Sequence, residues 1–256
     1  MNFNPFSKLF KSEKVKDDES LASVDQIKQL EASIGYKFKN KELLIQALKH
    51  RSILNFTKEE RISSNERLEF LGDAVVNLAV THFLYEQFPQ TEEGKLSKQK
   101  AILVSREVLA DVAQDLQLGE FVLLTKGEEK TGGRKRTSIL SNVFEAIVGA
   151  IYLDADYGQA EQFIRRALLK DFDSFISHEA YINYKSKLLE FTQKNHLGLP
   201  EYIIEKEEGP DHKKTFYVAV KIDSRKMGRG IGRSKKQAEQ RAAKEALERI
   251  QSKQNP

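Results

Sequence analysis

Residues 65–76 read NERLEFLGDAVV and contain the most informative pattern in the chain. On a helix at about 100° per residue, Glu66, Glu69 and Asp73 lie within about 60° of one another. Four apolar side chains gather on the opposite side of the same helix: Leu68, Leu71, Val75 and Leu78. The segment is therefore expected to form an amphipathic helix that carries a stripe of acids opposite its apolar face.

Three acids on one stripe of a helix repel one another. Like charges four residues apart, as Glu69 and Asp73 are, destabilise a helix by roughly 0.2–0.5 kcal/mol. A bound divalent cation would explain the stripe, because Mg²⁺ takes hard oxygen ligands and keeps several waters, so that one or two carboxylates per helix suffice. The alternative is a solvated helix face whose acids repel only weakly.

A second helical segment strengthens the metal hypothesis. In VFEAIVGAIYL, residues 143–153, Glu145 is the only charged residue, and Asn142 precedes it by one turn on the same face. A lone carboxylate in an apolar helix is costly to bury unless it is paired or coordinates a metal. The alternative is an ion pair with a buried arginine such as Arg67 or Arg106.

The charge of the chain is small but unevenly distributed. The net charge is +4, yet residues 183–256 carry 17 Lys/Arg against 10 Asp/Glu, a net charge of +7, whereas residues 1–182 carry 25 against 28, a net charge of −3. A basic segment joined to a mildly acidic one predicts a module that binds a polyanion, tethered to a part with a different task.

The cysteine count and the N-terminal segment limit the classes of protein to consider. The absence of cysteine excludes disulfides, thiolate chemistry and Cys-ligated zinc, so that any metal is held by oxygen or histidine. The first 20 residues lack the apolar core of a signal peptide, and no later segment has the length and apolarity to span a bilayer. We therefore expect a cytoplasmic protein without membrane contact, whose residues 1–24 form a disordered tail.

Apolar residues recur at three- and four-residue spacings from about residue 23 to residue 173. This period is that of helices, and it predicts an all-helical domain over residues 25–174. The period is lost in residues 172–182, and we assign residues 175–182 to a linker.

The pattern changes after the linker. A helix is predicted for residues 184–195, followed by a strand at YIIEKE. The segment TFYVAVKI alternates apolar and polar residues as a half-buried strand does, and a short strand near residues 228–233 leads into a final helix. The order over residues 183–251 is therefore helix, three strands, helix.

Taken together, these segments resemble the bacterial ribonuclease III family. NERLEFLGDAVV is similar to the signature helix of that family, and HRS, EEGKLSKQKAILVS and KGEEKTGGRKRTSILSNVFEAIVGAIYLDA match its flanking blocks in order. The resemblance runs from about residue 25 to residue 250. It implies a helical endonuclease domain followed by an α-β-β-β-α double-stranded RNA-binding domain. It also implies a homodimeric, Mg²⁺-dependent enzyme that needs no small-molecule cofactor.

The resemblance assigns roles to the acids. Glu69, Asp73 and Glu145 match the metal-binding acids of the family, and Mn²⁺ is expected to substitute for Mg²⁺. Glu66, and Glu93 in QTEEGKLS, match two further acids of the catalytic valley. The expected catalytic residues are therefore Asp73, Glu145, Glu66 and Glu93. Without the resemblance, Glu93 is an ordinary acid in the first turn of a helix, where it complements the helix dipole.

The fourth metal-ligand position, usually Asp in the family, is Asn142 in this chain. An amide oxygen can still bind Mg²⁺, although with less charge compensation. The departure leaves open a second hypothesis, a dimeric double-stranded RNA-binding protein with weak or no catalysis. The five acids favour the enzyme, because their removal would stabilise the helix of a protein that only dimerises.

The family resemblance also implies a mechanism and a dimer. Metal ions held by carboxylates can deprotonate water and stabilise the charge of a scissile phosphate without a His or Ser nucleophile. The family leaves 5′-phosphate and 3′-hydroxyl ends with short 3′ overhangs, since the two sites of the dimer cut opposite strands. Precursors of ribosomal and other RNAs are the expected substrates. The resemblance also implies that Phe70, beside Glu69, packs into the partner subunit. Its position on the wheel fits this, because it lies about 40° from Glu66 and away from the main apolar arc. The alternative is burial in its own core.

Residues 183–250 resemble a double-stranded RNA-binding domain. Ser234 and Gln237 form a predicted capping box, and Lys235 and Lys236 stand at the positive end of the helix that follows. A phosphate is attracted both by these charges and by the helix terminus, so that phosphate binding is expected here.

Further RNA contacts follow from the resemblance. Glu190 and Gln193 match positions that meet minor-groove 2′-hydroxyls, and His212 matches a minor-groove contact from the GPDHKKTF loop. For His212, a plain surface loop is the alternative. The basic side chains of residues 134–136, in GGRKRT, are expected either to bind the RNA backbone or to belong to a flexible solvated loop.

Overall fold

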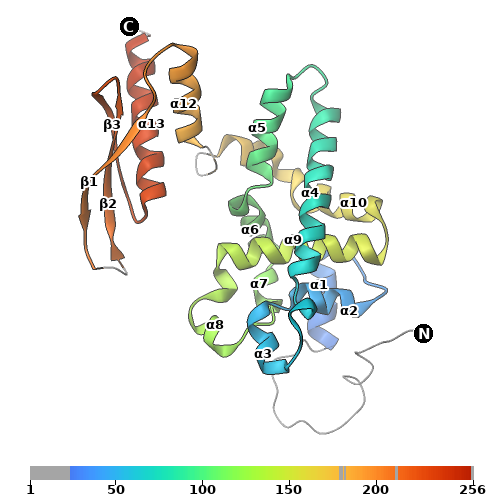
Figure 1. Cartoon of the computed structure of the whole chain (residues 1–256). Coiled ribbons are helices and arrows are strands. Elements are labelled where there is room, and N and C mark those ends of the chain that lie inside the picture. Colours follow the sequence, from blue (N-terminus) through green and yellow to red (C-terminus); the bar gives the residue numbers. More distant parts are fainter. Residues whose placement is uncertain (1–23, 179–180, 182, 211–212, 255–256) are drawn as a thin grey trace. The chain divides into compact units, whose positions relative to one another are not determined.

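The structure is a computed structural model that describes residues 24–178, 181, 183–210 and 213–254. The chain divides after Tyr181 into two compact units, and each is described by itself. The first unit is built from helices, and the second contains a three-stranded sheet with two helices (Figure 1). This combination of a helical part and an α-β-β-β-α part confirms the fold class predicted from the sequence.

The helices of the first unit follow one another with short connections. The α-helices are α1 (Val24–Ile34), α2 (Lys41–Leu48), α3 (Leu54–Thr57), α4 (Glu66–Gln87), α5 (Glu93–Leu103), α6 (Arg106–Asp115), α7 (Leu118–Phe121), α8 (Lys126–Lys130), α9 (Thr137–Asp154), α10 (Tyr157–Ala167) and α11 (Phe172–Ser177). The 3-10 helices are η1 (Arg51–Ile53), η2 (Arg61–Ser63), η3 (Gly133–Lys135) and η4 (Leu169–Asp171).

Helix α9 is the centre of the first unit, and α2, α4, α6 and α10 pack around it (Figure 1). Its residues are apolar on nearly every side, as expected for a helix that is surrounded by others. The ring of Phe144 packs against that of Phe163 on α10, with centroids 5.7 Å apart. The helix ends at Asp154, whose carboxylate accepts hydrogen bonds from the Tyr36 hydroxyl (2.7 Å) and the Asn40 amide (2.7 Å). The central helix is thus anchored to the start of α2.

Two details differ from the predictions. Helix α11 extends across the predicted boundary at residue 174. Its Phe175 belongs to the helical core and packs edge-on against Tyr181. The placement of Leu78 on the buried face of α4 was wrong, since this side chain is 56% exposed. Leu68 and Val75 are buried as predicted, so the apolar face of α4 is narrower than the helical wheel indicated.

The second unit contains α12 (Tyr184–Lys194), β1 (Glu201–Glu208), β2 (Thr215–Ile222), β3 (Arg225–Gly232) and α13 (Lys235–Gln254). The strands are antiparallel in the order β1-β2-β3. Val218, Val220 and Ile222 of β2 are buried, as the alternation in TFYVAVKI predicts. They pack against the small-residue side of α13, which consists of Ala238, Ala242, Ala243 and Ala246.

Within the described part of the chain, no helix has both the length and the apolarity needed to cross a membrane.

Candidate functional site

Helices α4 and α9 cross at two glycines. A Cβ atom at Gly72 would lie 1.8 Å from the carbonyl oxygen of Glu145, and one at Gly149 would lie 2.3 Å from the carbonyl oxygen of Leu68. These distances are far below van der Waals contact, so the backbones can approach this closely only because both positions lack a side chain. The close crossing brings the acidic stripe of α4 next to Glu145 of α9.

The pKa values of two acids show that the carboxylates at this crossing influence one another. Burial raises the pKa of Glu145 from 4.5 to about 7, and the negative charges of Asp73 and Glu69 add to the shift. Burial also raises the pKa of Glu69, with further contributions from Glu66 and Asp73. Tertiary structure thus places Glu69, Asp73 and Glu145 in one electrostatic environment.

Arg106, at the first position of α6, is the cation of this environment. Its charge lowers the pKa of both Glu69 and Glu145, although burial and the neighbouring acids outweigh it. Of Arg106 and Arg67, the two ion-pair partners expected for Glu145 from the sequence, Arg106 is the one whose charge lowers the pKa of this half-buried carboxylate.

Asn142 contacts the acidic group through its side-chain amide. A hydrogen bond from Asn142 favours the charged form of Glu69 and lowers its pKa, while the Asn142 carbonyl oxygen accepts a 3.3 Å hydrogen bond from the Ser141 hydroxyl. Asn142 therefore helps to hold Glu69 ionised in a half-buried site.

Asn77 is a neighbour of the acids that the sequence analysis missed. Its side-chain amide donates a 3.0 Å hydrogen bond to the Asp73 carboxylate from one helical turn further along α4. The four-residue spacing from Asp73 was a signal that could have identified it.

These residues fit a divalent metal ion by their chemistry. They offer hard oxygen donors, and the pKa of Glu145 is raised first by burial and then by the charges of Asp73 and Glu69, a repulsion that a cation would relieve. Within the described residues, no group of three or more His, Cys, Asp or Glu side chains converges closely enough to hold a metal on its own. Mg²⁺ commonly binds through one or two carboxylates, waters and substrate phosphates, so a preformed protein cage is not required.

Glu66 and Glu93, the two remaining predicted acids, have other contacts. Arg61 donates to Glu66 through Nε (2.8 Å) and Nη2 (3.2 Å), and Arg51 Nη1 lies 3.7 Å away. The bond from Arg61 lowers the pKa of Glu66, and so do the charges of both arginines. Glu93 accepts a 2.6 Å hydrogen bond from Ser97 within α5. Glu66 is thus paired with two arginines while its charge still raises the pKa of Glu69, and Glu93 is engaged by its own helix.

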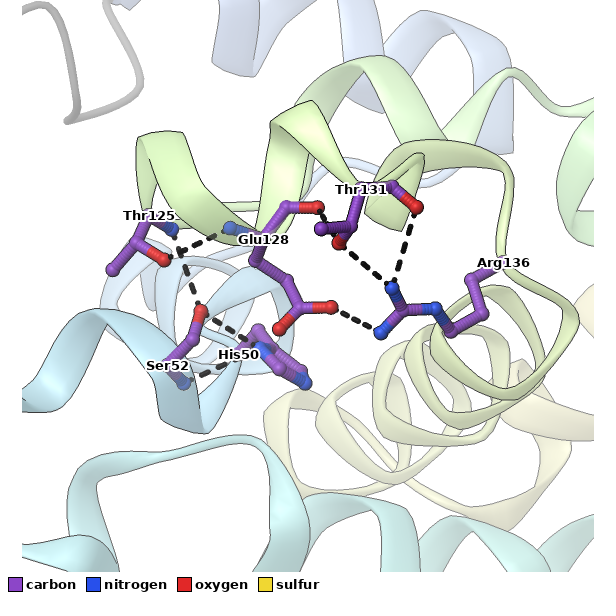
Figure 2. Close-up of polar contacts among 6 residues, drawn as sticks. All are labelled: His50, Ser52, Thr125, Glu128, Thr131 and Arg136. Atoms are coloured by element: carbon purple, nitrogen blue, oxygen red, sulfur yellow. Dashed lines mark hydrogen bonds and ion pairs between the residues drawn. The ribbon is translucent and has the colours of Figure 1, made fainter. Parts of the chain in front are cut away.

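Beside this site, a hydrogen-bonded network joins η1 to α8 (Figure 2). The His50 ring accepts from the Ser52 amide (3.2 Å) and lies 2.9 Å from the Ser52 hydroxyl, which in turn accepts from the Thr125 amide (3.4 Å). Burial lowers the pKa of His50, in keeping with a neutral ring whose Nδ1 is an acceptor. Figure 2 also shows Arg136 bound to Glu128 and Thr131.

The basic run of residues 134–136 is largely held by the protein itself. Arg134 donates through Nη1 to three backbone carbonyls, those of Gly119, Glu120 and Val122, at 2.8–3.1 Å. Since Arg136 also has internal partners, Lys135 is the side chain of this run whose exposure suits an external ligand. Binding of the RNA backbone by this run stays a prediction, and two of its three basic side chains have partners within the protein.

An exposed apolar stripe runs along α4 next to the acids. Phe70 is 82% exposed, Tyr85 is 74% exposed, and Ala74 and Leu78 lie between them on the same side of the helix. Burial of Phe70 in its own core, the alternative considered from the sequence, is wrong.

In the second unit, the start of α13 has the predicted cap. The Gln237 amide donates to the Ser234 hydroxyl (3.2 Å), whereas the Gln237 side chain accepts from the Arg233 amide (2.8 Å) one residue before the cap. Lys235 and Lys236 are exposed at this terminus, and Lys235 Nζ lies 3.6 Å from Glu207 and 5.8 Å from the centroid of the Phe216 ring.

The remaining predicted RNA contacts lie on and near α12. Glu190 and Gln193 are exposed on this helix, and Leu189 beside them is 39% exposed. His212 lies outside the described residues, so its predicted contact stays a prediction.

Comparison with known proteins yields matches for both units. Residues 40–172 match a model described as ribonuclease-III-like, and residues 184–250 match the double-stranded RNA binding motif. The ribonuclease 3 of Anoxybacillus flavithermus is 46% identical over 226 residues, which cover 88% of this chain and 94% of that protein. The ribonuclease 3 of Aliarcobacter butzleri is 43% identical over 222 residues, or 87% of this chain and 96% of that protein.

A solved structure is similar to the first unit. The nuclease domain of ribonuclease III from Campylobacter jejuni, described with a region involved in dimer formation, has a TM-score of 0.53 and 44% sequence identity. It covers 57% of this chain and 99% of its own.

Proposed function

The chain belongs to the ribonuclease III family and is an endonuclease for double-stranded RNA, and on this basis we propose how its residues carry out the cleavage. The family depends on divalent metal ions, and we propose Mg²⁺ as the ion of this chain, with Mn²⁺ as a substitute. Glu69, Asp73 and Glu145 are the proposed carboxylate ligands, and Asn142 is the proposed amide ligand. The raised pKa of Glu145 is the observation that most favours this assignment.

The bound metal would supply a water deprotonated near neutral pH and would stabilise charge on the scissile phosphate. The chain's own groups prepare this site. Glu145 must lose its proton to act as a ligand, and the positive charge of Arg106 favours that loss. Asn77 holds one oxygen of Asp73 by a hydrogen bond, which orients the carboxylate. Glu93, bound to Ser97 within α5, stays a predicted catalytic residue.

The exposed stripe on α4 supports a homodimer. Phe70, Leu78 and Tyr85 present a long apolar surface, and such a surface on a folded unit is typical of a protein interface. The nearness of Phe70 to Glu69 would place the interface beside the metal site. With two sites per dimer on opposite strands, cleavage would leave 5′-phosphate and 3′-hydroxyl ends with short 3′ overhangs.

The second unit is proposed to hold the RNA duplex. Lys235 and Lys236 at the start of α13 would bind backbone phosphates, and Glu190 and Gln193 would meet 2′-hydroxyls in the minor groove. Ribosomal and other RNA precursors in the cytoplasm are the proposed substrates.

The test is cleavage of a long, perfectly paired RNA by the purified protein in Mg²⁺, Mn²⁺ or EDTA. We expect metal-dependent cutting to short duplexes, which Glu145→Gln abolishes. Glu120→Gln, an exposed glutamate of α7, is the matched control and should cut as the unchanged protein does. Tight duplex binding without cutting in either metal would instead support a non-catalytic RNA-binding dimer.

A further inference from the structure

Two arginines flank Glu66 at the edge of the acidic site. The Arg61 side chain is 76% exposed and that of Arg51 is 65% exposed, whereas the side chain of Glu66 between them is 32% exposed. The pairing from Arg61 is bidentate, at 2.8 and 3.2 Å, and Arg51 approaches to 3.7 Å. One carboxylate thus positions two guanidinium groups toward solvent.

The backbone beneath Arg51 is fixed. It is the first residue of η1, which the His50 ring caps through the Ser52 amide, and the Ser52 hydroxyl is tied to the Thr125 amide (Figure 2). Arg51 therefore extends from a rigid turn, and its charge also contributes to the lowered pKa of His50.

The backbone beneath Arg61 is fixed as well. Its carbonyl accepts a 2.9 Å hydrogen bond from the Ser64 hydroxyl, and Gln46 donates to the carbonyls of Ile62 (3.3 Å) and Ser64 (3.2 Å). The next residue, Asn65, is joined to the Lys49 carbonyl by its amide (2.9 Å). Both arginines thus come from turns that are anchored to the helical core.

The charge balance at this edge suits RNA. An acidic metal site repels phosphates, and an unpaired Glu66 would extend that repulsion outward. Two arginines around one carboxylate leave a net positive charge, and a guanidinium has five N–H donors, of which Arg61 uses two for Glu66. The remaining donors can bind phosphate oxygens in the planar geometry that arginine favours.

We propose that Arg51 and Arg61 bind backbone phosphates of the duplex next to the cleavage site, and that Glu66 positions this pair and is not a metal ligand. The inference rests on the proposed function, because it takes the acids at the α4–α9 crossing as the metal site. It assigns to Glu66 a different role from the catalytic one expected from the sequence.

The first test is the salt dependence of duplex binding in EDTA, where no cutting interferes. Each phosphate contact that is lost makes the plot of log affinity against log salt shallower by about one unit. We expect this change for Arg61→Gln and about twice this change when Arg51→Gln is added, whereas Arg61→Lys keeps most of the slope. An unchanged slope in the double variant would overturn the proposal.

Arg165→Gln is the matched control. Arg165 donates to Glu86 (2.9 Å) and Glu161 (2.8 Å), so the substitution removes the same charge from a similar pairing. Glu86 lies 20 residues after Glu66 on α4, which is about 30 Å along the helix. Loss of the Arg165 charge is expected to leave the slope of log affinity against log salt unchanged.

The second test separates positioning from metal binding. Mn²⁺ titration followed by electron paramagnetic resonance should give a dissociation constant for Glu66→Gln within about twofold of that of the unchanged protein. Glu145→Gln should raise this dissociation constant at least tenfold. A comparable loss of Mn²⁺ affinity in Glu66→Gln would show that Glu66 is a metal ligand and would refute the proposal. Neither test needs cleavage, so a protein that binds RNA without cutting would contradict the proposed function alone.

Discussion

Gly72 of α4 and Gly149 of α9 face each other, and each lies against the backbone of the opposite helix. The space for a Cβ at Gly72 is occupied by the Glu145 carbonyl oxygen, at 1.8 Å. The two glycines therefore set the distance between the helices that carry the acids. The acidic site depends on this distance as much as on the acids themselves.

We expect Gly72→Ala to push the helices apart, because the obstacle is backbone and cannot move aside. Overpacking of this kind costs about 1–3 kcal/mol of unfolding free energy. Urea denaturation measures this loss of unfolding free energy, and the rate of RNA cleavage should fall as well. Gly94→Ala, where nothing lies within 4 Å of the added Cβ, is the control and should be nearly neutral. Equal effects of the two substitutions would contradict the close crossing.

The raised pKa of Glu145 predicts how stability depends on pH when metal is removed by EDTA. Between pH 4.5 and about 7, the unfolded chain has an ionised Glu145 while the folded protein keeps it protonated. Unfolding then releases a proton, so the stability contributed by this group is present at low pH and is lost as pH rises toward 7. Relative to Glu145→Gln, the unchanged protein should lose on the order of 1–3 kcal/mol of unfolding free energy as the pH rises from 4.5 to about 7.

Parallel urea titrations of the two proteins from pH 4.5 to 8 measure the difference. Curves that stay parallel would mean that neither burial nor the neighbouring acids raise the pKa of Glu145 in the folded protein.

Asn142→Asp should strengthen metal binding. The substitution adds a carboxylate to Glu69, Asp73 and Glu145, and a larger ligand charge raises the affinity for a divalent cation. We expect about tenfold tighter binding of Mn²⁺ in a titration, together with lower stability in EDTA because another acid joins a repelling group. Asn142→Ala should change the affinity in the opposite direction. Identical affinities for the three proteins would exclude residue 142 from the ligand set.

Phe70→Ser should weaken the proposed dimer while leaving the subunit fold intact, because the ring is 82% exposed and contributes little to the core. Loss of a central aromatic residue from an interface costs about 2 kcal/mol or more, which corresponds to roughly thirtyfold weaker association. Analytical ultracentrifugation across a concentration series measures this. Leu199→Ser, which alters a 68% exposed residue of the second unit, should not change the association.

Lys235→Gln combined with Lys236→Gln should weaken duplex binding and make its salt dependence shallower by about two units, one for each phosphate contact. Circular dichroism is expected to show an intact α13, because the Ser234 cap does not involve either lysine side chain. Lys206→Gln, a 61% exposed lysine of β1, is the control. Loss of affinity without a change in slope would point to a structural effect.

The sequence was sufficient to identify the elements and the type of chemistry. The period of apolar residues predicted the helical unit, and the alternation in TFYVAVKI predicted a strand that the sheet contains. The isolation of Glu145 in an apolar helix predicted an unusual carboxylate, and its pKa is indeed raised. These predictions succeed because hydrophobic periodicity and the cost of burying a charge are properties of a single segment.

Tertiary structure alone decided which groups share a site. The wheel placed Glu66 with Glu69 and Asp73, and the charge of Glu66 does raise the pKa of Glu69, but the turns at η1 and η2 also bring Arg51 and Arg61 to Glu66. The same wheel placed Leu78 in the core, whereas the narrow contact of α4 with its neighbours leaves that side chain exposed. Periodicity gives the direction of a side chain from its own helix axis. Its partners depend on segments far away in the chain, whose positions are set by the packing of the whole unit.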